Sequence, residues 1–197
     1  MNVRALFDSP WIYAASQRLI PFTVWVYQDL IRRRALARPG ARVLDVGCGV
    51  GAHRQFFPAC DYTGVDINPG YIEQANRRFG GGFRVMDATR LEFPAESFHQ
   101  TLCVATFHHL SDDQARAAIA ETWRVVGPGG TVHIIDPVIT DDPRAWLKRW
   151  VFANDRGRFQ RTREQMLALV ASVAPIRDSE LVRGRLHDVI YICLSKA

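Results

Sequence analysis

Residues 41–51 read Ala-Arg-Val-Leu-Asp-Val-Gly-Cys-Gly-Val-Gly, and this stretch decides the fold of the 197-residue chain. Its short, mostly apolar run Val-Leu-Asp-Val is typical of a strand that is buried on both faces of a parallel sheet. The strand runs into Gly47, Gly49 and Gly51, and a helix is expected from Ala52 onward. Because glycine has no Cβ, backbone N–H groups in such a turn can approach a bound ligand closely.

Four acidic residues lie at the ends of expected strands. Asp45 stands two residues before the first glycine, where a buried carboxylate is costly without a partner. Asp66, Asp87 and Asp136 follow later apolar runs. In doubly wound sheets the carboxyl ends of the strands meet at the edge where ligands bind. Any one Asp could simply cap a turn or a helix, but together with the glycine turn they predict a binding site, with Asp136 as the weakest member.

Strand and helix signals alternate between residues 41 and 136, which predicts a parallel sheet with right-handed crossovers. Asn68-Pro69 supplies a helix N-cap followed by proline, and Ser111-Asp-Asp-Gln114 is a capping box. Gly127-Pro-Gly-Gly130 predicts a sharp stop. The expected strands after the first are 62–67, 83–88, 98–107 and 131–135, and the expected helices are 70–79 and one that begins near residue 111.

The pattern changes after Asp136. A helix is expected over 143–152, and a second capping box at Thr162 predicts another helix after it. Two strands near 176–183 and 187–195 are joined too tightly for a crossover helix, so they must pair antiparallel. The last strand is apolar on both of its faces, which predicts an interior position in the sheet.

The first segment, residues 10–37, predicts a helix that is divided at Pro21. Packing on the domain is the favoured interpretation. A lid over an apolar substrate and a patch resting on a membrane face are the alternatives.

The composition, 48% hydrophobic and 23% charged, is that of a globular domain. No apolar run approaches the roughly 20 residues that span a bilayer, and the first residues do not form a secretory signal. The four cysteines lie far apart without metal or redox spacing, so reduced thiols and a cytoplasmic location are expected. The net charge of +5 is almost entirely arginine, and it permits anionic substrates without establishing nucleic-acid binding.

Residues 43–51 closely resemble the first motif of class I S-adenosylmethionine-dependent methyltransferases of the small-molecule type. Residues 91–99 and 124–130 resemble further loops of that family, although His99 stands where an Asp is common there. Dinucleotide-dependent dehydrogenases share the strand–turn–helix physics, but their Gly-x-Gly-x-x-Gly spacing is not met here.

The resemblance implies an α/β fold. It would be a Rossmann-like, doubly wound sheet of seven strands, mostly parallel, with an antiparallel C-terminal hairpin strand and helices on both faces. It also implies a single methyltransferase domain over 1–197. Within it, 1–38 would form a helical lid or cap, 39–138 the cofactor-binding core, and 139–197 the substrate-side helices and the hairpin.

The cofactor that the resemblance implies is S-adenosylmethionine, with S-adenosylhomocysteine as the product. Asp66 would accept hydrogen bonds from the ribose hydroxyls, and Asp87 from the exocyclic amine of adenine. Asp45 would hold the methionyl ammonium, directly or through water. The other residues expected to bind the cofactor are Gly47, Cys48, Gly49, Gly51, Ile67, Ala88, Val104 and Ala105.

Methyl transfer needs in-line placement of a nucleophile in a dry pocket, and a general base helps when the nucleophile carries a proton. Thr106-Phe-His108-His109 lies where substrate meets cofactor in the resembling family. His108 is the candidate base, His109 is the other choice, and packing beneath the loop is the structural alternative. His53, His133 and His187 belong to no evident constellation, and no metal site is expected.

Resembling enzymes that methylate exocyclic amines of nucleic acid bases have an Asn-Pro-Pro-Tyr type of loop after the fourth strand, and those of the cytosine-C5 kind have a Pro-Cys pair. The fourth strand here ends in neither. A small-molecule or lipid-like acceptor is therefore favoured over nucleic acid. Residues 144–163 carry seven Arg or Lys residues among aromatic ones, which suits either a substrate with phosphate or carboxylate or a solvated surface. A nicotinamide-dependent dehydrogenase and a non-catalytic, methyltransferase-like interaction module are the rival functions, and the acceptor atom and the oligomeric state stay open.

Overall fold

The computed structural model describes residues 21–142, 144–145, 148, 158–184 and 187–197. They form a seven-stranded sheet in the order β3-β2-β1-β4-β5-β7-β6. The strands from β3 to β5 pair in parallel, and β7 runs antiparallel to both β5 and β6. The expected doubly wound α/β fold with an antiparallel C-terminal hairpin is thus confirmed. The strands are β1 (Arg42–Val46), β2 (Asp61–Asp66), β3 (Phe83–Val85), β4 (Phe98–Val104), β5 (Val126–Val138), β6 (Ile176–Arg183) and β7 (Asp188–Ser195).

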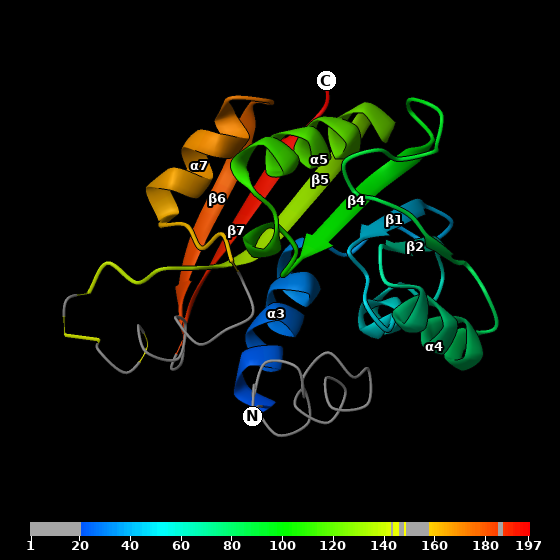
Figure 1. Ribbon diagram of the computed structural model, residues 1–197. Coiled ribbons are helices and arrows are strands. Elements are labelled where there is room, and N and C mark those ends of the chain that lie inside the picture. Colours follow the sequence, from blue (N-terminus) through cyan, green and yellow to red (C-terminus); the bar gives the residue numbers. More distant parts are fainter. Residues whose placement is uncertain (1–20, 143, 146–147, 149–157, 185–186) are drawn as a thin grey trace.

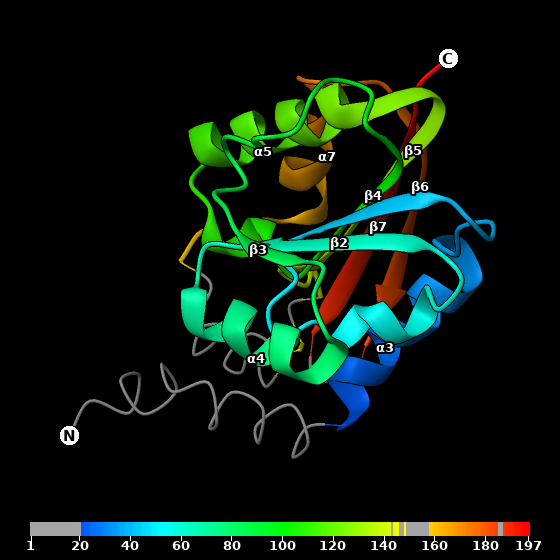
Figure 2. The same ribbon diagram turned by 90° about the vertical axis from the view of Figure 1, so that its right-hand side faces the viewer.

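Helices cover both faces of this sheet (Figure 1, Figure 2). One face carries α3 and α4, and the other carries α5 and α7. Because side chains alternate along a strand, β7 contributes to a separate core on each face. Ile192 packs in the core beneath α5 and α7, and Tyr191 packs in the core beneath α3. The helices are α3 (Pro21–Arg34), α4 (Pro69–Phe79), α5 (Asp112–Val125) and α7 (Arg163–Ala171).

The caps that the sequence predicts are present. Asn68 accepts a hydrogen bond from the Gly70 N–H at 2.9 Å and opens α4, which ends at Gly80 with φ of 78°. The Ser111 and Thr162 capping boxes open α5 and α7. These local signals fix where the helices on both faces begin.

The segment after the glycine turn differs from the expected α-helix. It is a single 3₁₀ helix, η1 (Ala52–Phe56). Pro58 follows Phe57, and the residue before a proline avoids the helical region, which stops the turn from lengthening.

Two strand expectations also need correction. The third strand ends at Val85 rather than at 88, because Asp87 forms a turn with Thr89. The helix α5 ends at Val125, just before the glycine-rich segment, as predicted, but the fifth strand starts at Val126 rather than at 131 and includes that segment. A register shift between Phe98 and Gln100 of β4 absorbs the extra residues.

Two expectations lie largely outside the described residues. The division of the first helix at Pro21 concerns residues 1–20, and most of the helix expected over 143–152 is likewise not described. Within the described residues, no helix is long and apolar enough to cross a membrane.

Candidate cofactor and catalytic site

The glycine turn between β1 and η1 is pinned to the neighbouring strand. The N–H groups of Gly47 and Cys48 both donate to the Val65 carbonyl, at 2.8 and 3.0 Å. Gly47 has φ of 75°, and a Cβ there would collide with the side chain of Thr106. Gly49 has φ of 53°, and a Cβ there would meet no atom within 4 Å. A side chain would therefore collide with its neighbours at Gly47 and would meet free space at Gly49.

The Asp66 carboxylate faces this turn from the end of β2. Its Oδ2 accepts from the Gly49 N–H at 2.9 Å, and its Oδ1 accepts from the Asn68 N–H at 2.8 Å. Burial raises the pKa of Asp66, and the two backbone hydrogen bonds act against that rise. Each carboxylate oxygen has a second lone pair, so both can still accept from hydroxyl groups of a ligand.

Asp45 lies fully buried beneath the turn. Its Oδ2 accepts from the Tyr62 hydroxyl at 2.5 Å and from His53 Nδ1 at 3.1 Å. Burial, then the negative charge of Asp45, raises the pKa of Tyr62, so that phenol stays protonated and remains a donor. Oδ1 of Asp45 is buried without a hydrogen-bond partner. A buried carboxylate oxygen without a partner is costly, and a donor from a bound ligand or water would satisfy it.

The expectation that His53 belongs to no constellation is wrong, since it contacts Asp45, and Tyr62 was not recognised at all. The register of β1 and β2 explains how Tyr62 reaches the acid. Asp45 stands opposite Gly64, two residues from Tyr62 on the same face. The Phe83 ring and the Cys48 thiol occupy the space where a Gly64 side chain would lie. The contact of Tyr62 could have been inferred from a parallel pairing of the two strands, whereas the approach of His53 depends on the 3₁₀ turn.

The other predicted cofactor residues lie around the same edge of the sheet. Asp87 is exposed, and its Oδ1 accepts from the N–H and the hydroxyl of Thr89, both at 2.8 Å, so it does form a turn. Ile67 is 69% exposed although apolar, beside Asp66. Gly51 has a packing role as well, because a Cβ there would strike the Phe83 ring. The predicted residues not yet placed are Cys48, buried in the α3-side core, Ala88, partly buried, and Val104, buried at the end of β4.

β4 ends in an unusual conformation. Ala105 has φ of 52°, which is rare for a residue with a side chain and costs free energy, and its N–H donates to the Ile135 carbonyl at 2.8 Å. This bend turns the chain into η2 (Phe107–His109), which carries the candidate base. The strain sits where the predicted substrate and cofactor positions meet.

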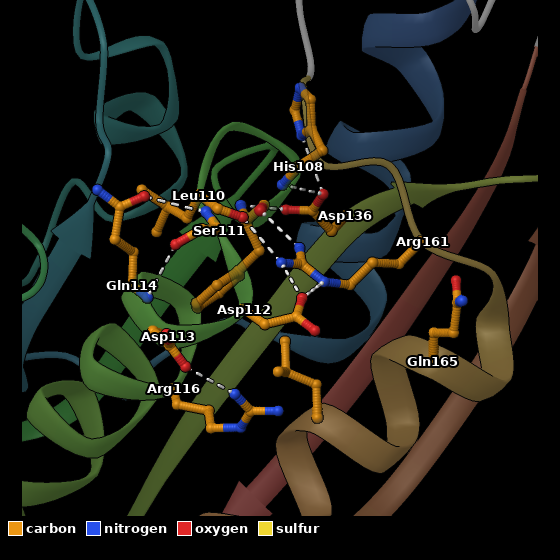
Figure 3. Close-up of polar contacts among 12 residues, drawn as sticks. His108, Leu110, Ser111, Asp112, Asp113, Gln114, Arg116, Asp136, Arg161 and Gln165 are labelled. Carbon is orange, nitrogen blue, oxygen red and sulfur yellow. Dashed lines mark hydrogen bonds and ion pairs between the residues drawn. The ribbon is translucent and has the colours of Figure 1, made fainter.

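Asp136, at the end of β5, holds this turn from one side (Figure 3). Its Oδ2 accepts from the N–H groups of Thr106 and Phe107 at 2.9 and 2.7 Å. Its Oδ1 accepts from the N–H and from Nδ1 of His108 at 3.2 and 2.9 Å. Both side chains are buried, His108 being 6% and Asp136 2% exposed. Because a carboxylate only accepts, Nδ1 of His108 donates in this contact, and Nε2 is the other nitrogen of the ring.

Arg161 holds the same turn from the other side, and sequence analysis placed it only within a charged segment. Its guanidinium donates to the carbonyls of Phe107 and Leu110, both at 2.8 Å, and to Asp112 Oδ1 at 2.9 and 2.7 Å. It is 7% exposed. Nothing in the periodicity marks it, because its partners are backbone atoms about 50 residues away.

His133 and His187 have hydrogen-bond partners away from the glycine turn and the His108 turn. His133 is buried between Tyr191, at 2.9 Å, and Thr131, at 2.9 Å, and burial lowers its pKa to about 4. His187 lies 3.1 Å from the Tyr27 hydroxyl. Within the described part of the chain, no three His, Cys, Asp or Glu residues are grouped so that they could hold a metal ion.

The glycine turn, the strand-end carboxylates and the seven-stranded order are similar to those expected from the resemblance to class I S-adenosylmethionine-dependent methyltransferases. Residues 43–130 match the family model described as a methyltransferase domain. A solved S-adenosylmethionine-dependent methyltransferase of Methanosarcina mazei has the same fold, with a TM-score of 0.71 at 19% identity over 82% of this chain and 94% of its own.

Curated relatives differ in the acceptors that their names give. A tRNA (carboxymethyluridine(34)-5-O)-methyltransferase of Arabidopsis thaliana is 34% identical over 56% of this chain and 28% of its own length. A 2-methyl-6-phytyl-1,4-hydroquinone methyltransferase of Synechocystis is 36% identical over 57% of this chain and 37% of its own. The matches thus span roughly a quarter to two fifths of these relatives, and they include small-molecule and tRNA enzymes.

Proposed function

We propose that this chain transfers a methyl group from S-adenosylmethionine to a small-molecule or lipid-like acceptor. The observation that carries the proposal is the pair of carboxylates around the glycine turn. Asp66 has acceptor capacity left for two hydroxyls, and Asp45 has a buried oxygen without a partner. A ligand that carries a ribose diol and an ammonium group would satisfy both, and S-adenosylmethionine carries both.

The residues present fit the cofactor at several points. Asp66 would hold the ribose, Asp87 and Ala88 the adenine, with the exposed Ile67 packed against its ring. Asp45 would hold the ammonium group, with the backbone of Gly47 to Gly49 along the methionyl part. When bound, the cofactor supplies a methyl group on a positively charged sulfur. The chain's own tasks are to orient the acceptor, exclude water and take up a proton.

The proton acceptor would be Nε2 of His108. Asp136 fixes the ring through Nδ1 at 2.9 Å, so the proton would be taken up at Nε2, the other nitrogen of the ring. An acceptor hydroxyl, phenol or acidic carbon would lose its proton to Nε2 as it attacks. The alternative is that the His108 ring only packs beneath the turn. In that case its replacement should not change the rate at which a bound acceptor is methylated.

The small-molecule acceptor is supported by the quinol relative and by the lack of the loop types that methylate bases. The tRNA relative makes RNA the competing acceptor. Incubation of the protein with methyl-labelled cofactor and three fractions, a polar metabolite extract, a lipid extract and bulk tRNA, separates the two. Label in one of the first two fractions is expected. Label in tRNA alone would overturn the small-molecule proposal but keep methyl transfer.

Cofactor binding is tested with S-adenosylhomocysteine and Asp66→Ala. The product should raise the melting temperature of the protein and NADH should not. Asp66→Ala should weaken binding by about 1–3 kcal/mol in calorimetry, the usual cost of removing a charged hydrogen-bond partner. Asp61→Ala, at the exposed start of the same strand, is the matched control and should bind normally. Stabilisation by NADH instead would favour the dehydrogenase, and no binding of either would favour the interaction module.

A further inference from the structure

The turn that carries His108 is held by two charged side chains of opposite sign (Figure 3). Asp136 accepts hydrogen bonds from the backbone N–H groups of residues 106–108 and from Nδ1 of the ring. Arg161 donates hydrogen bonds to the carbonyls of Phe107 and Leu110. The carbonyl of His108 itself accepts from the Phe159 N–H at 3.1 Å, two residues before Arg161. The turn is therefore fixed at both its donors and its acceptors.

The burial of Arg161 needs an explanation. A guanidinium is strongly destabilised away from water unless its N–H groups are paired. Here Nε, Nη1 and Nη2 each donate to an oxygen of the turn or of Asp112 at 2.7 to 2.9 Å. The planar fork of arginine reaches all three acceptors in one geometry, which a lysine ammonium cannot do.

Arg161 is itself anchored at its backbone. Its carbonyl accepts from the Ile139 N–H at 2.9 Å, and Thr162, the next residue, bridges to Ile139 and caps α7. Ile139 lies directly beyond β5, the strand that carries Asp136 near its C-terminal end. The cation and the carboxylate that hold the turn are thus fixed to the same part of the sheet.

We propose that Arg161 is a positioning residue for His108, which fixes the carbonyls of the turn so that the ring holds one orientation against Asp136. The inference rests on the proposed function, because it gives Arg161 a task in the same site. Arg161 does not contact the ring in this arrangement. It acts through Phe107 and Leu110, on either side of the two histidines.

A purely structural role makes a different prediction. If Arg161 only ties α5 to the segment before α7, its loss lowers stability and leaves the surviving folded molecules with an unchanged His108. If it positions the turn, the ring changes its surroundings even in a fully folded variant. The state of the ring separates the two roles, whereas stability alone does not.

The experiment compares Arg161→Gln and Arg161→Lys with Arg163→Gln. Arg163 lies two residues further on, is 44% exposed and stands 4.0 Å from Glu164, so it is a matched arginine without the buried contacts. Nitrogen-15 spectra of the histidine rings across a pH series report the tautomer and the titration midpoint of His108. Calorimetry with S-adenosylhomocysteine reports the cofactor site in the same samples.

Both Arg161 variants should lose the single Nδ1–H tautomer of His108 and shift its titration midpoint by at least half a pH unit. Affinity for S-adenosylhomocysteine should stay within about threefold, since Asp66 and the glycine turn are untouched. Arg163→Gln should match the wild type in every measurement. With an acceptor in hand, the loss should appear in kcat rather than KM, and added guanidinium should partly restore Arg161→Gln.

An unchanged His108 tautomer and midpoint in folded Arg161→Gln would overturn the inference. If that variant does not fold, Arg161→Lys carries the same decision, because it keeps the charge and loses the fork. Failure of the wild type to bind S-adenosylhomocysteine would instead remove the proposed function, whatever the ring shows. The two failures are therefore distinguishable.

Discussion

At the scale of single residues, Gly47 and Gly49 do different work although they stand two positions apart. Both have positive φ, 75° and 53°, where a side chain is strained. Only Gly47 is also crowded, by the side chain of Thr106. Only Gly49 donates its N–H to the Asp66 carboxylate and borders open space. Gly47 therefore allows the close packing of β1 against the turn after β4, and Gly49 borders the proposed ligand site.

The two glycines predict two different defects. Gly49→Ala should lower the free energy of unfolding by about 1–2 kcal/mol, the cost of a left-handed alanine, and should weaken binding of S-adenosylhomocysteine. Gly47→Ala should lower it further, because the new methyl group also displaces Thr106. Urea denaturation and calorimetry on both variants check this. Equal destabilisation by the two would show that the contact with Thr106 carries no weight.

The site residues divide according to how local their signals are. The glycine turn could be predicted because it belongs to one short motif whose glycines need positive φ, and Asp66 because it follows an apolar run at the end of a strand. His53 and Arg161 could not, because their partners come together only once a 3₁₀ turn and a distant loop are in place. Arg161 in particular stands in a charged segment that suits a solvated surface equally well, and only its buried contacts reveal its task.

At the scale of elements, α5 begins with a capping box that lies next to the turn of His108. The Ser111 hydroxyl accepts from the Gln114 N–H at 3.3 Å, and the Gln114 side chain accepts from the Ser111 N–H at 3.0 Å. The same helix start bears Asp112, which pairs with Arg161. The start of α5 and the His108 turn are thus adjacent along the chain but are held by different contacts.

Ser111→Ala should therefore destabilise the protein without disturbing the site. The expected loss is about 1 kcal/mol in the free energy of unfolding, as for other N-cap serines replaced by alanine. Thr162→Ala, which removes the equivalent cap of α7, should cost a similar amount. Urea denaturation measures both, and the His108 ring spectrum should not change in Ser111→Ala. A shifted ring signal there would mean that the cap, and not Arg161, sets the turn.

The element boundaries show where sequence patterns suffice. Caps at Asn68, Ser111 and Thr162 placed three helix starts correctly because a cap is a contact within four residues. The lengths of β3 and β5 were wrong because they depend on pairing with other strands. The segment 127–130 follows the end of α5, as its composition predicts, and a register shift against β4 includes it in the strand.

At the scale of the whole molecule, the core beneath α3 contains a titratable group that must stay neutral. His133 is 5% exposed, and burial lowers its pKa from 6.5 to about 4. Between pH 6.5 and 4 the unfolded chain therefore binds a proton that the folded protein rejects. Stability must fall as the pH falls through this window.

The loss attributable to His133 should be about 2 kcal/mol between pH 7.5 and pH 5, since each pKa unit corresponds to about 1.4 kcal/mol. His133→Gln, which cannot gain the proton, should show a shallower fall over the same range. Urea denaturation at the two pH values gives the difference. Parallel slopes for wild type and His133→Gln would show that His133 is accessible to protons in the folded state.

The position of β7 has a consequence for synthesis on the ribosome. β6 pairs with no strand but β7 in this sheet, and β7 is the last of the seven strands to be made. Until residues 188–195 have emerged from the exit tunnel, β6 has no neighbour and β5 presents a bare edge. A nascent chain in that state exposes unpaired backbone groups of β5 although the glycine turn and the strand-end carboxylates have already been made, so chaperone contact should concentrate on this late interval.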